Sequence, residues 1–442
     1  MSTKADARTA KVRKNILASI VIKGADTLVY LLLVPVTLGY LNAYEYGIWL
    51  TLSSLLSWIN SFDIGLGNGL RNKLAIALAE GNREKSRIYV STTLFMLIMV
   101  VTVILITCSF IICYVDWYSL LNVKRFIVGD LDEVVLFSFF FFCINFIFKF
   151  LGNVYQALQL PVFNNLILFG GHLVSLVFIL VLKQVIPGSL FWVAIVYSAA
   201  TPVVYFLCYP VTFFWLYPYL APSIRYFRKE YVKDLLSLGL LFFVIQVMGV
   251  VLFSMSNLMI SYLFGPEQVT PYNISFRYFS IVTIFFNLIF APMWSAATDA
   301  YARKDMAWIS SILRKMQRLM VLIAAGILIM VLCSNVVYRL WVGESVSIPF
   351  MMSELMGLYQ FIYIYSLSYS YILNGMGKLR VQVFNIVLMA VCFCPLCYFL
   401  SSIFGVVGIV IGMCLINLSG AVLNTIQLHL ILNEKATGIW LK

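Results

Sequence analysis

Long, uninterrupted runs of apolar residues constrain this chain more than any other feature of its sequence. A membrane-spanning helix needs about 20 mostly apolar residues, and runs of that length recur from one end of the sequence to the other. Hydrophobic residues make up 62% of the chain and charged residues 11%, whereas soluble domains hold about 45–50% and about 25%. The runs do not alternate as the strands of a barrel do, and helices satisfy their own backbone groups in lipid. The sequence therefore predicts an all-α polytopic membrane protein.

We expect about twelve transmembrane helices in the 442 residues. The predicted spans are Asn15–Tyr40, Gly47–Gly67, Ile88–Val115, Val134–Leu158, Val162–Leu182, Ser189–Trp215, Leu235–Phe264, Tyr272–Ala297, Met316–Val337, Pro349–Leu373, Val381–Ile403 and Val406–Leu432. The basic N-terminal segment precedes the first span and lacks a signal-peptide cleavage pattern, so we expect that span to stay in the protein. An even number of spans places both termini on one side of the membrane.

Basic residues gather in alternate loops, which fixes the orientation. If the N-terminus is cytoplasmic, 23 of the 30 Lys and Arg residues lie in cytoplasmic segments, and only Lys124, Arg125, Lys183 and Arg339 lie outside. This bias is the positive-inside pattern of membrane proteins. It accounts for most of the net charge of +12, so the charge gives no reason to expect a nucleic-acid partner. The basic loops are expected to meet anionic membrane lipids.

A weak internal repeat predicts two halves. When the chain is shifted by 222 residues, Tyr40, Leu41 and Glu45 align with Tyr262, Leu263 and Glu267. The order of spans and of loop charges also agrees. We therefore predict an N-terminal six-helix bundle over residues 1–216, a cytoplasmic linker over 217–234 and a C-terminal six-helix bundle over 235–442.

Charged residues inside spans are costly in lipid, so each one is a candidate functional residue. Lys23 and Asp26 lie three residues apart on the first helix and can pair. The remaining candidates are Asp63, Lys149, Arg277 and Glu354. Each has a plainer alternative: Lys149 and Arg277 can extend toward an interface, Asp63 can cap a helix end, and Glu354 can lie at the surface.

Uncharged polar residues in the spans give a second, weaker signal. His172 is more typical of a packing residue than of a proton relay. The many amides favour a wet cavity with hydrogen-bonding groups suited to sugars, although polar packing between helices explains any single one. They include Asn145, Asn153, Gln156, Asn164, Asn165, Gln246, Asn257, Asn287 and Asn374.

The sequence shows no ATP-binding motif of the form G-x-x-x-x-G-K-[ST], so we expect no ATP hydrolysis. Cys392, Cys394 and Cys397 form a CxCxxC pattern in an apolar run, where small apolar residues are expected rather than a metal site. We therefore predict no metal, no cofactor and no enzymatic activity.

The N-terminal stretches LVPVTLGYLNAYEYGIWLTLSS and FDIGLGNGLRNKLA resemble bacterial polysaccharide flippases. These are the O-antigen and capsule repeat-unit translocases of the multidrug/oligosaccharidyl-lipid/polysaccharide (MOP) exporter superfamily. The sequence similarity covers about the first 95 residues, and the rest of the chain agrees with the family in span number and loop pattern.

The resemblance implies a protein of the bacterial inner membrane with two MATE-like six-helix bundles and cytoplasmic termini. Its expected activity is to move undecaprenyl-pyrophosphate-linked oligosaccharide repeat units from the inner to the outer leaflet by alternating access. Positive residues of the cavity would hold the pyrophosphate, and Lys23, Lys149 and Arg277 are the candidates by charge and depth. Asp26, Asp63 and Glu354 are candidates for coupling to Na⁺ or H⁺, or for charge pairing.

Two other functions stay open at this point. One is a cation-coupled multidrug antiporter of the same fold, which relies on acidic residues rather than basic ones. The other is a polytopic glycan polymerase, ligase or acyltransferase, for which no sizeable outer loop is evident. The expected partners of a flippase are the lipid-linked oligosaccharide, a polysaccharide polymerase and other export components.

Overall fold

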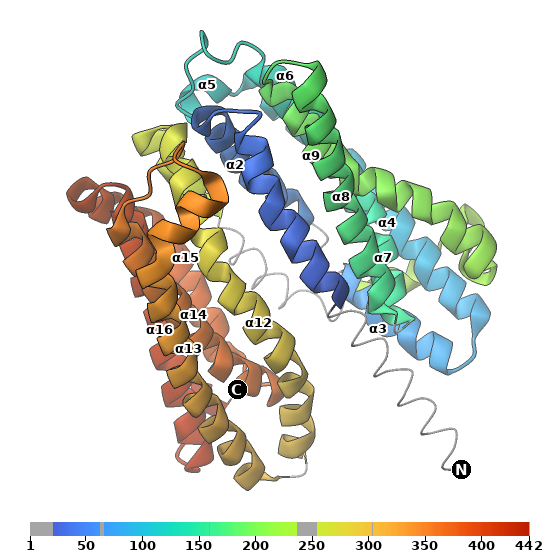
Figure 1. The fold of residues 1–442 in the computed structure, drawn as a ribbon. Coiled ribbons are helices and arrows are strands. Elements are labelled where there is room, and N and C mark those ends of the chain that lie inside the picture. Colours follow the sequence, from blue (N-terminus) through green and yellow to red (C-terminus); the bar gives the residue numbers. More distant parts are fainter. Residues whose placement is uncertain (1–20, 62–65, 159, 237–253, 303, 442) are drawn as a thin grey trace. The chain divides into compact units, whose positions relative to one another are not determined.

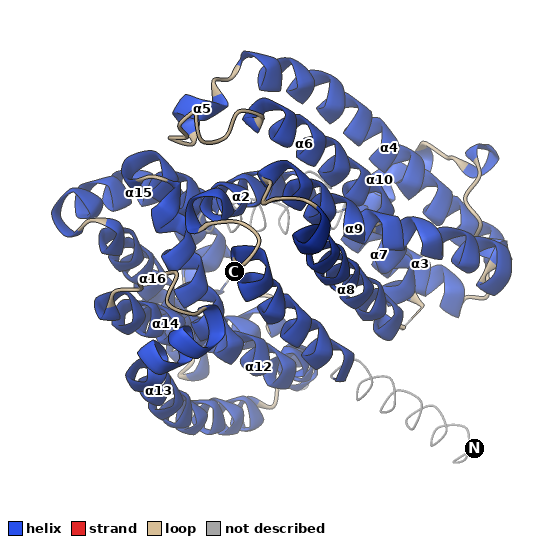
Figure 2. Ribbon diagram, turned by 45° about the horizontal axis from the view of Figure 1, so that its top comes forward, coloured by secondary structure: helices blue, strands red, loops and turns tan. Residues whose placement is uncertain are grey.

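A computed structural model of the chain describes residues 21–61, 66–158, 160–236, 254–302 and 304–441. The regular secondary structure of these residues is helical throughout, as Figure 2 shows. The chain forms two compact units, Met1–Val250 (unit 1) and Val251–Lys442 (unit 2). The all-α prediction is confirmed, whereas the domain boundaries at residues 216 and 235 stay a prediction.

Unit 1 begins with a helix over Val21–Leu38. It continues with α2 (Ala43–Leu56), α3 (Leu66–Ala79), α4 (Arg83–Tyr114), the short α5 (Trp117–Leu120), α6 (Leu131–Phe148), α7 (Phe150–Ala157), α8 (Pro161–Val185) and α9 (Leu190–Pro210), labelled in Figure 1. Polar side chains cap the N-termini of several of these helices. Asn42 and Glu45 form a capping box at α2, and Asn82 accepts a hydrogen bond from the Lys85 backbone N–H at α4. Such caps satisfy backbone N–H groups that a helix leaves free at its first turn.

Unit 2 contains a helix over 254–264. The helices α12 (Val269–Ala302), α13 (Met306–Val342), α14 (Phe350–Gly375), α15 (Arg380–Phe404) and α16 (Val406–Leu432) follow. The turns between them use residues that suit sharp reversals. Gly343, Gly377 and Gly405 have positive φ angles, which glycine adopts at little cost.

Eight described helices are long and apolar enough to cross a membrane. Helices α12 and α14, with 34 and 26 residues, are also long enough to span, but tyrosine and serine make α14 less apolar. The predicted single span Gly47–Gly67 is wrong in its outline. Helix α2 ends at Leu56, a 3-10 turn covers Ser57–Ser61, and α3 begins at Leu66. The polar residues of this turn explain the early end of α2.

The two units pack their helices in the same order. In unit 1, α6 and α8 both pack on α9, and in unit 2, α14 and α15 both pack on α16. Helix α4 begins at Arg83, and a shift of 222 residues moves this start to position 305. Helix α13 begins one residue later, at Met306. The structure therefore supports the repeat that the sequence only suggested.

The residues after α9 belong with unit 1. They form short 3-10 turns over Pro218–Leu220 and Ile224–Tyr226, followed by α10 (Glu230–Leu236). The Arg87 Nε atom donates to the Ala221 carbonyl at 2.7 Å, and Ser91 Oγ accepts from the Ser223 N–H at 3.1 Å. The Arg87 guanidinium also lies 4.3 Å from the centre of the Tyr226 ring. These contacts attach the segment to the first turns of α4.

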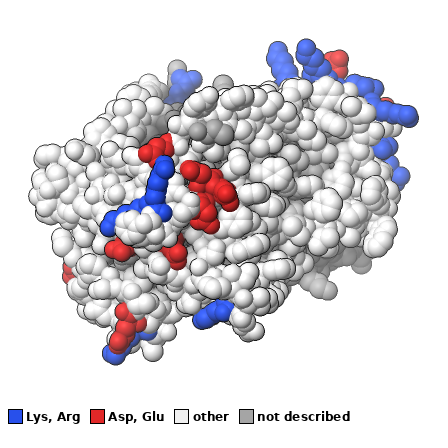
Figure 3. Space-filling view, turned by 90° about the horizontal axis from the view of Figure 1, so that it is seen from above, with Lys and Arg blue, Asp and Glu red and all other residues white. Residues whose placement is uncertain are grey.

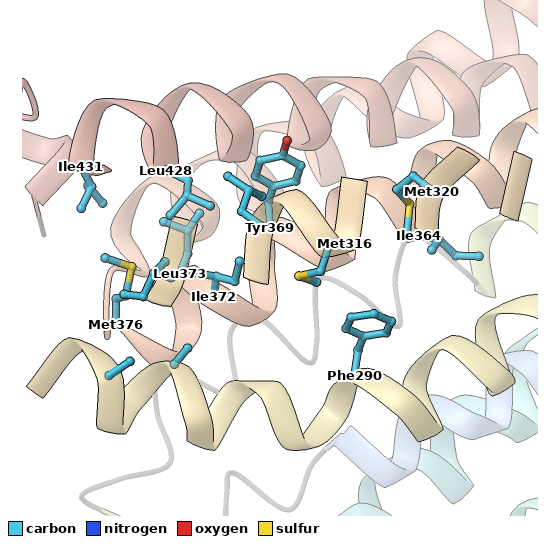
Figure 4. Packing of buried hydrophobic residues seen from close by; sticks show 14 of the residues in the cluster. Phe290, Met316, Met320, Ile364, Tyr369, Ile372, Leu373, Met376, Leu428 and Ile431 are labelled. Atoms are coloured by element: carbon cyan, nitrogen blue, oxygen red, sulfur yellow. The ribbon is translucent and has the colours of Figure 1, made fainter. Parts of the chain in front are cut away.

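A hydrophobic core of unit 2 forms where α12, α13, α14 and α16 meet. Figure 4 shows Phe290, Met316, Tyr369 and Leu428 directed toward one another from these helices. In lipid such contacts stabilise by packing, because the surrounding acyl chains are as apolar as leucine. The outer faces are apolar too: Val321, Leu332 and Leu340 are largely exposed. Figure 3 likewise shows a surface of mostly uncharged side chains.

Candidate functional site

A cluster of three ionisable side chains lies inside unit 1. Lys23 and Asp26 lie on the helix Val21–Leu38, and the Lys23 Nζ atom lies 2.9 Å from Asp26 Oδ2. Helix α8 brings His172 to the other side of the carboxylate, with its Nδ1 atom 2.6 Å from Asp26 Oδ1. The pairing of Lys23 with Asp26 that their spacing allows is confirmed. The histidine, for which the sequence favoured a packing role, has a carboxylate partner instead.

The burial of the three side chains differs in a way that bears on chemistry. The Asp26 side chain is 5% exposed, whereas those of Lys23 and His172 are 39% and 30% exposed. A buried carboxylate is costly unless it is paired and hydrogen-bonded, and here each of its oxygens has a partner. Lys23 and His172 therefore remain partly accessible while Asp26 is enclosed. Tyr30 lies beside the histidine, with ring centres 5.3 Å apart.

This arrangement can do two things chemically. The 2.6 Å hydrogen bond joins the Asp26 carboxylate to the His172 imidazole, and pairs of these residue types inside spans serve as proton relays in transporters, which suits coupling to H⁺. The partly exposed Lys23 ammonium has three donors, of which Asp26 uses one, which suits an anionic ligand.

Lys149 lies deeper in unit 1, at the junction of α6 and α7. It is half-buried, and its ammonium forms no hydrogen bond or ion pair with any residue in the described ranges. One helical turn earlier, Asn145 Oδ1 is buried and also lacks a partner among those residues. Residues i and i+4 share a helix face. A cation and an amide oxygen that both lack partners among the described residues therefore lie on one face of this span.

The other charged candidates do not join this cluster. Arg277 is half-buried on α12, and Glu354 is exposed near the start of α14, both in unit 2. Asp63 lies outside the residues that the structure describes. The structure thus brings Lys23 and Asp26 together in unit 1 and places Arg277 and Glu354 on helices of unit 2.

Several of the predicted amides are bonded to polar side chains of neighbouring helices. Asn164 accepts from the Tyr205 hydroxyl at 3.0 Å, and Asn287 accepts from the Tyr371 hydroxyl at 2.7 Å. Asn257 Oδ1 accepts from Asn273 Nδ2 at 2.9 Å. These three amides serve polar packing between helices, the plainer of the two roles. Gln246 lies outside the described residues.

Sequence reasoning missed a second polar region, in unit 2. Ser366 and Ser370 on α14, Gln382 and Asn385 on α15, and Asn417 and Asn424 on α16 line one pocket. A signal for it was present, because each pair lies three, four or seven residues apart. This spacing places both members on one helix face.

Cys392, Cys394 and Cys397 show little sign of a metal site. They are exposed, half-buried and buried respectively, so they do not share one environment. In the part of the chain that the structure describes, no group of three His, Cys, Asp or Glu side chains is arranged to hold a metal ion.

Comparison with known proteins places the fold. The chain is 20% identical over 392 residues to a protein of Yersinia pseudotuberculosis named "putative O-antigen export protein", covering 86% of this chain and 87% of that one. No family model matches the sequence.

Among solved structures, a multidrug-resistance MATE transporter of the MOP superfamily in its inward-facing conformation superposes with a TM-score of 0.75 at 15% identity. The match covers 95% of this chain and all of that one. The outward-facing conformation of a MATE transporter gives a TM-score of 0.66 at 15% identity, covering 96% of each chain.

A MOP-superfamily transporter of Pyrococcus furiosus, described as having a binding pocket of reverse polarity, gives a TM-score of 0.64 at 14% identity. The match covers 97% of this chain and 96% of that one. The chain therefore has the MATE fold and is a multi-pass membrane protein. The predicted MATE-like architecture is confirmed.

Proposed function

We propose that this protein is a flippase for lipid-linked oligosaccharides. It moves undecaprenyl-pyrophosphate-linked repeat units from the inner to the outer leaflet of the bacterial inner membrane, with both termini in the cytoplasm. The observation that carries the proposal is the likeness to an O-antigen export protein along 86% of the chain. The MATE fold agrees with it, since that fold belongs to transporters. On this proposal the chain transports its substrate and does not act as an enzyme.

The basic residues inside the helices fit an anionic cargo. A pyrophosphate carries at least two negative charges, and such charges do not cross lipid unaided. Lys149 supplies a cation that no described residue neutralises, and Lys23 offers donors that Asp26 does not use. Arg277 adds a planar group suited to phosphate. The lipid tail would stay among the acyl chains while the head group passes through the protein.

Two sources of free energy are available for the step. An inside-negative membrane potential favours outward movement of a negative head group by about 2.3 kcal/mol per charge per 100 mV. Coupling to H⁺ through Asp26 and His172 would add to this, since a 2.6 Å hydrogen bond links them. Na⁺ is the alternative coupling ion. We expect a polysaccharide polymerase and other export components to receive the product.

One observation favours a second function, a cation-coupled multidrug antiporter. Several of the similar solved structures are multidrug MATE transporters, and Asp26 supplies a buried acidic residue. An antiporter would export organic cations in an ion-dependent way and would tolerate the loss of Lys149. A polytopic glycan polymerase or acyltransferase is the third and weakest alternative.

The deciding experiment measures the leaflet of the lipid-linked glycan in cells that lack this protein. The proposal predicts accumulation facing the cytoplasm, rescue by the wild-type chain, and no rescue by the triple variant Lys23→Ala, Lys149→Ala, Arg277→Ala. Normal transfer to the outer leaflet, with a glycan left unpolymerised or unmodified, would overturn the flippase and favour the enzyme. Ion-dependent drug efflux that persists in the triple variant would favour the antiporter.

A further inference from the structure

The second polar region forms a pocket of about 150 Å³ in unit 2, bounded by α14, α15 and α16. Six polar side chains line it: Ser366, Ser370, Gln382, Asn385, Asn417 and Asn424. Ile386 and Met389 add an apolar wall. The lining contains no charged residue, in contrast to the Lys23–Asp26–His172 cluster of unit 1.

A glycine keeps this pocket open. Gly420 lies on α16 between residues of the other two helices. A Cβ atom at this position would lie 3.2 Å from Ser366 Oγ and 3.5 Å from Asn385 Nδ2. Any side chain larger than hydrogen would therefore occupy the space between α14 and α15. Gly420 has an ordinary helical backbone conformation that any residue can adopt. Glycine is therefore explained at this position by the limited space and not by the backbone.

The amides of the pocket use only part of their hydrogen-bonding capacity within the protein. Asn424 Nδ2 donates to Ser366 Oγ at 3.2 Å and to Ser370 Oγ at 2.9 Å. Asn417 Nδ2 donates to the Met413 carbonyl at 2.9 Å, and Asn385 Oδ1 accepts from Ser419 Oγ at 3.1 Å. The oxygens of Asn417 and Asn424 and the nitrogen of Asn385 are left without partners among the described residues.

Gln382 gives the sharpest sign that a ligand belongs here. Its Nε2 atom is buried and has no hydrogen-bond partner among the described residues. A buried polar group without a partner is costly, and the large majority of such groups in native proteins are satisfied. A ligand that accepts a hydrogen bond in this pocket would supply the missing partner.

We propose that this pocket binds a neutral sugar residue of the transported glycan through its hydroxyl groups. The inference rests on the proposed function and adds a subsite for the sugar to it. A sugar hydroxyl both donates and accepts, which matches a lining that offers amide oxygens and amide nitrogens together. The C–H face of a sugar ring suits the wall of Ile386 and Met389. Because no cationic side chain lines the pocket, a phosphate has no counter-charge there.

The test uses two variants with matched controls. Gln382→Met removes the unpartnered amide without breaking a hydrogen bond inside the protein, and Gly420→Ala fills the space beside Ser366. The controls are Leu388→Met, an exposed site on the same helix α15, and Gly326→Ala, where an added Cβ meets no atom within 4 Å. All four are made in the full-length chain.

The first readout is saturation-transfer NMR on the purified chain, with the neutral oligosaccharide released from its lipid carrier as the probe. We expect the wild type and both controls to bind the sugar. Gln382→Met should weaken binding about five- to tenfold, which is the effect of losing one hydrogen bond. Gly420→Ala should weaken binding by a similar factor, because its methyl group takes up space beside Ser366. Equal binding by all five proteins would overturn the inference, as would loss of binding in the controls.

The second readout, leaflet transfer in cells, separates this inference from the proposed function. If deletion of the protein traps the glycan at the inner leaflet, and the two pocket variants slow transfer where the controls do not, the inference stands. If deletion traps the glycan but the pocket variants transfer it at the wild-type rate, the pocket proposal alone fails. If the variants change only the dependence of transfer on Na⁺, the pocket holds an ion, and the sugar subsite is likewise rejected.

Discussion

Helix α8 of unit 1 and helix α15 of unit 2 occupy equivalent places, since each packs on the long helix that follows it, α9 and α16 respectively. Yet α8 contributes His172 to an ion-paired cluster, whereas α15 contributes Gln382 and Asn385 to a neutral pocket. The shared packing order shows that the repeat specifies how helices associate. The difference shows that it leaves the polar chemistry of each interior free. On the proposed function, the anionic head group and a neutral sugar of the cargo would use these two kinds of chemistry.

Placing a charge in the neutral pocket of unit 2 is expected to have the largest effect. Asn424 is 5% exposed and donates to two serine hydroxyls. Asn424→Asp removes both donors and adds a carboxylate without a cation, so we expect a loss of about 3 kcal/mol or more in unfolding free energy. Thermal unfolding of the purified chain measures it. Asn424→Leu, which removes the bonds without adding charge, should cost less. An equal loss would mean that this pocket tolerates a charge.

Removing the negative charge from the Lys23–Asp26–His172 cluster of unit 1 is the reciprocal change. Asp26→Asn leaves Lys23 and His172 without their anion, at an expected cost of about 1–3 kcal/mol. A double-mutant cycle with His172→Phe isolates the contribution of the 2.6 Å contact. We expect a favourable coupling energy. Strict additivity of the two substitutions would show that the cluster does not act as a unit.

Equivalent helix contacts should respond unequally to an added methyl group. A Cβ on Gly171 of α8 would lie 3.0 Å from the Thr201 Cα atom and 2.5 Å from its Oγ1. A Cβ on Gly412 of α16 would lie 2.5 Å from the Cys397 Sγ atom and 3.7 Å from the Cys397 Cα atom. Because a sulfur can rotate aside and a Cα atom cannot, Gly171→Ala should cost about 1–3 kcal/mol and Gly412→Ala less.

Melting temperatures of the two variants decide this comparison, with Gly24→Ala as the control, since nothing lies within 4 Å of an added Cβ there. A larger loss for Gly412→Ala would reverse our ranking of the two interfaces.

Lys149→Met is expected to change stability least, by within about 0.5 kcal/mol, because no described residue pairs with the ammonium. Transfer of the lipid-linked glycan should nevertheless fall about tenfold if this cation meets the pyrophosphate, as for the loss of one charge-assisted hydrogen bond. Leaflet assays and unfolding measured on the same protein check both expectations. Lys183→Met, an exposed lysine at the end of α8, is the matched control. A large loss of stability with normal transfer would give Lys149 a structural role instead.

The linear pattern anticipated the fold well because the lipid environment acts on each segment separately. Every run of about 20 apolar residues must form a helix whatever its neighbours do, so span number and class follow from local sequence. The pairing of Lys23 with Asp26 was equally local, since three residues separate them on one helix. The boundary of the second span was missed because Ser57–Ser61 forms a tight turn inside an otherwise apolar segment.

What only the tertiary structure decided are the contacts between helices distant in sequence. Asp26 and His172 lie 146 residues apart, and no periodicity connects them. Gln382, Gly420 and Ser366 gain a shared meaning only when α14, α15 and α16 pack together. Helix formation depends on neighbours along the chain, so sequence alone determined the membrane class, the helices and the likeness to flippases. Sites depend on which helix faces meet, and side-chain packing between helices settles that.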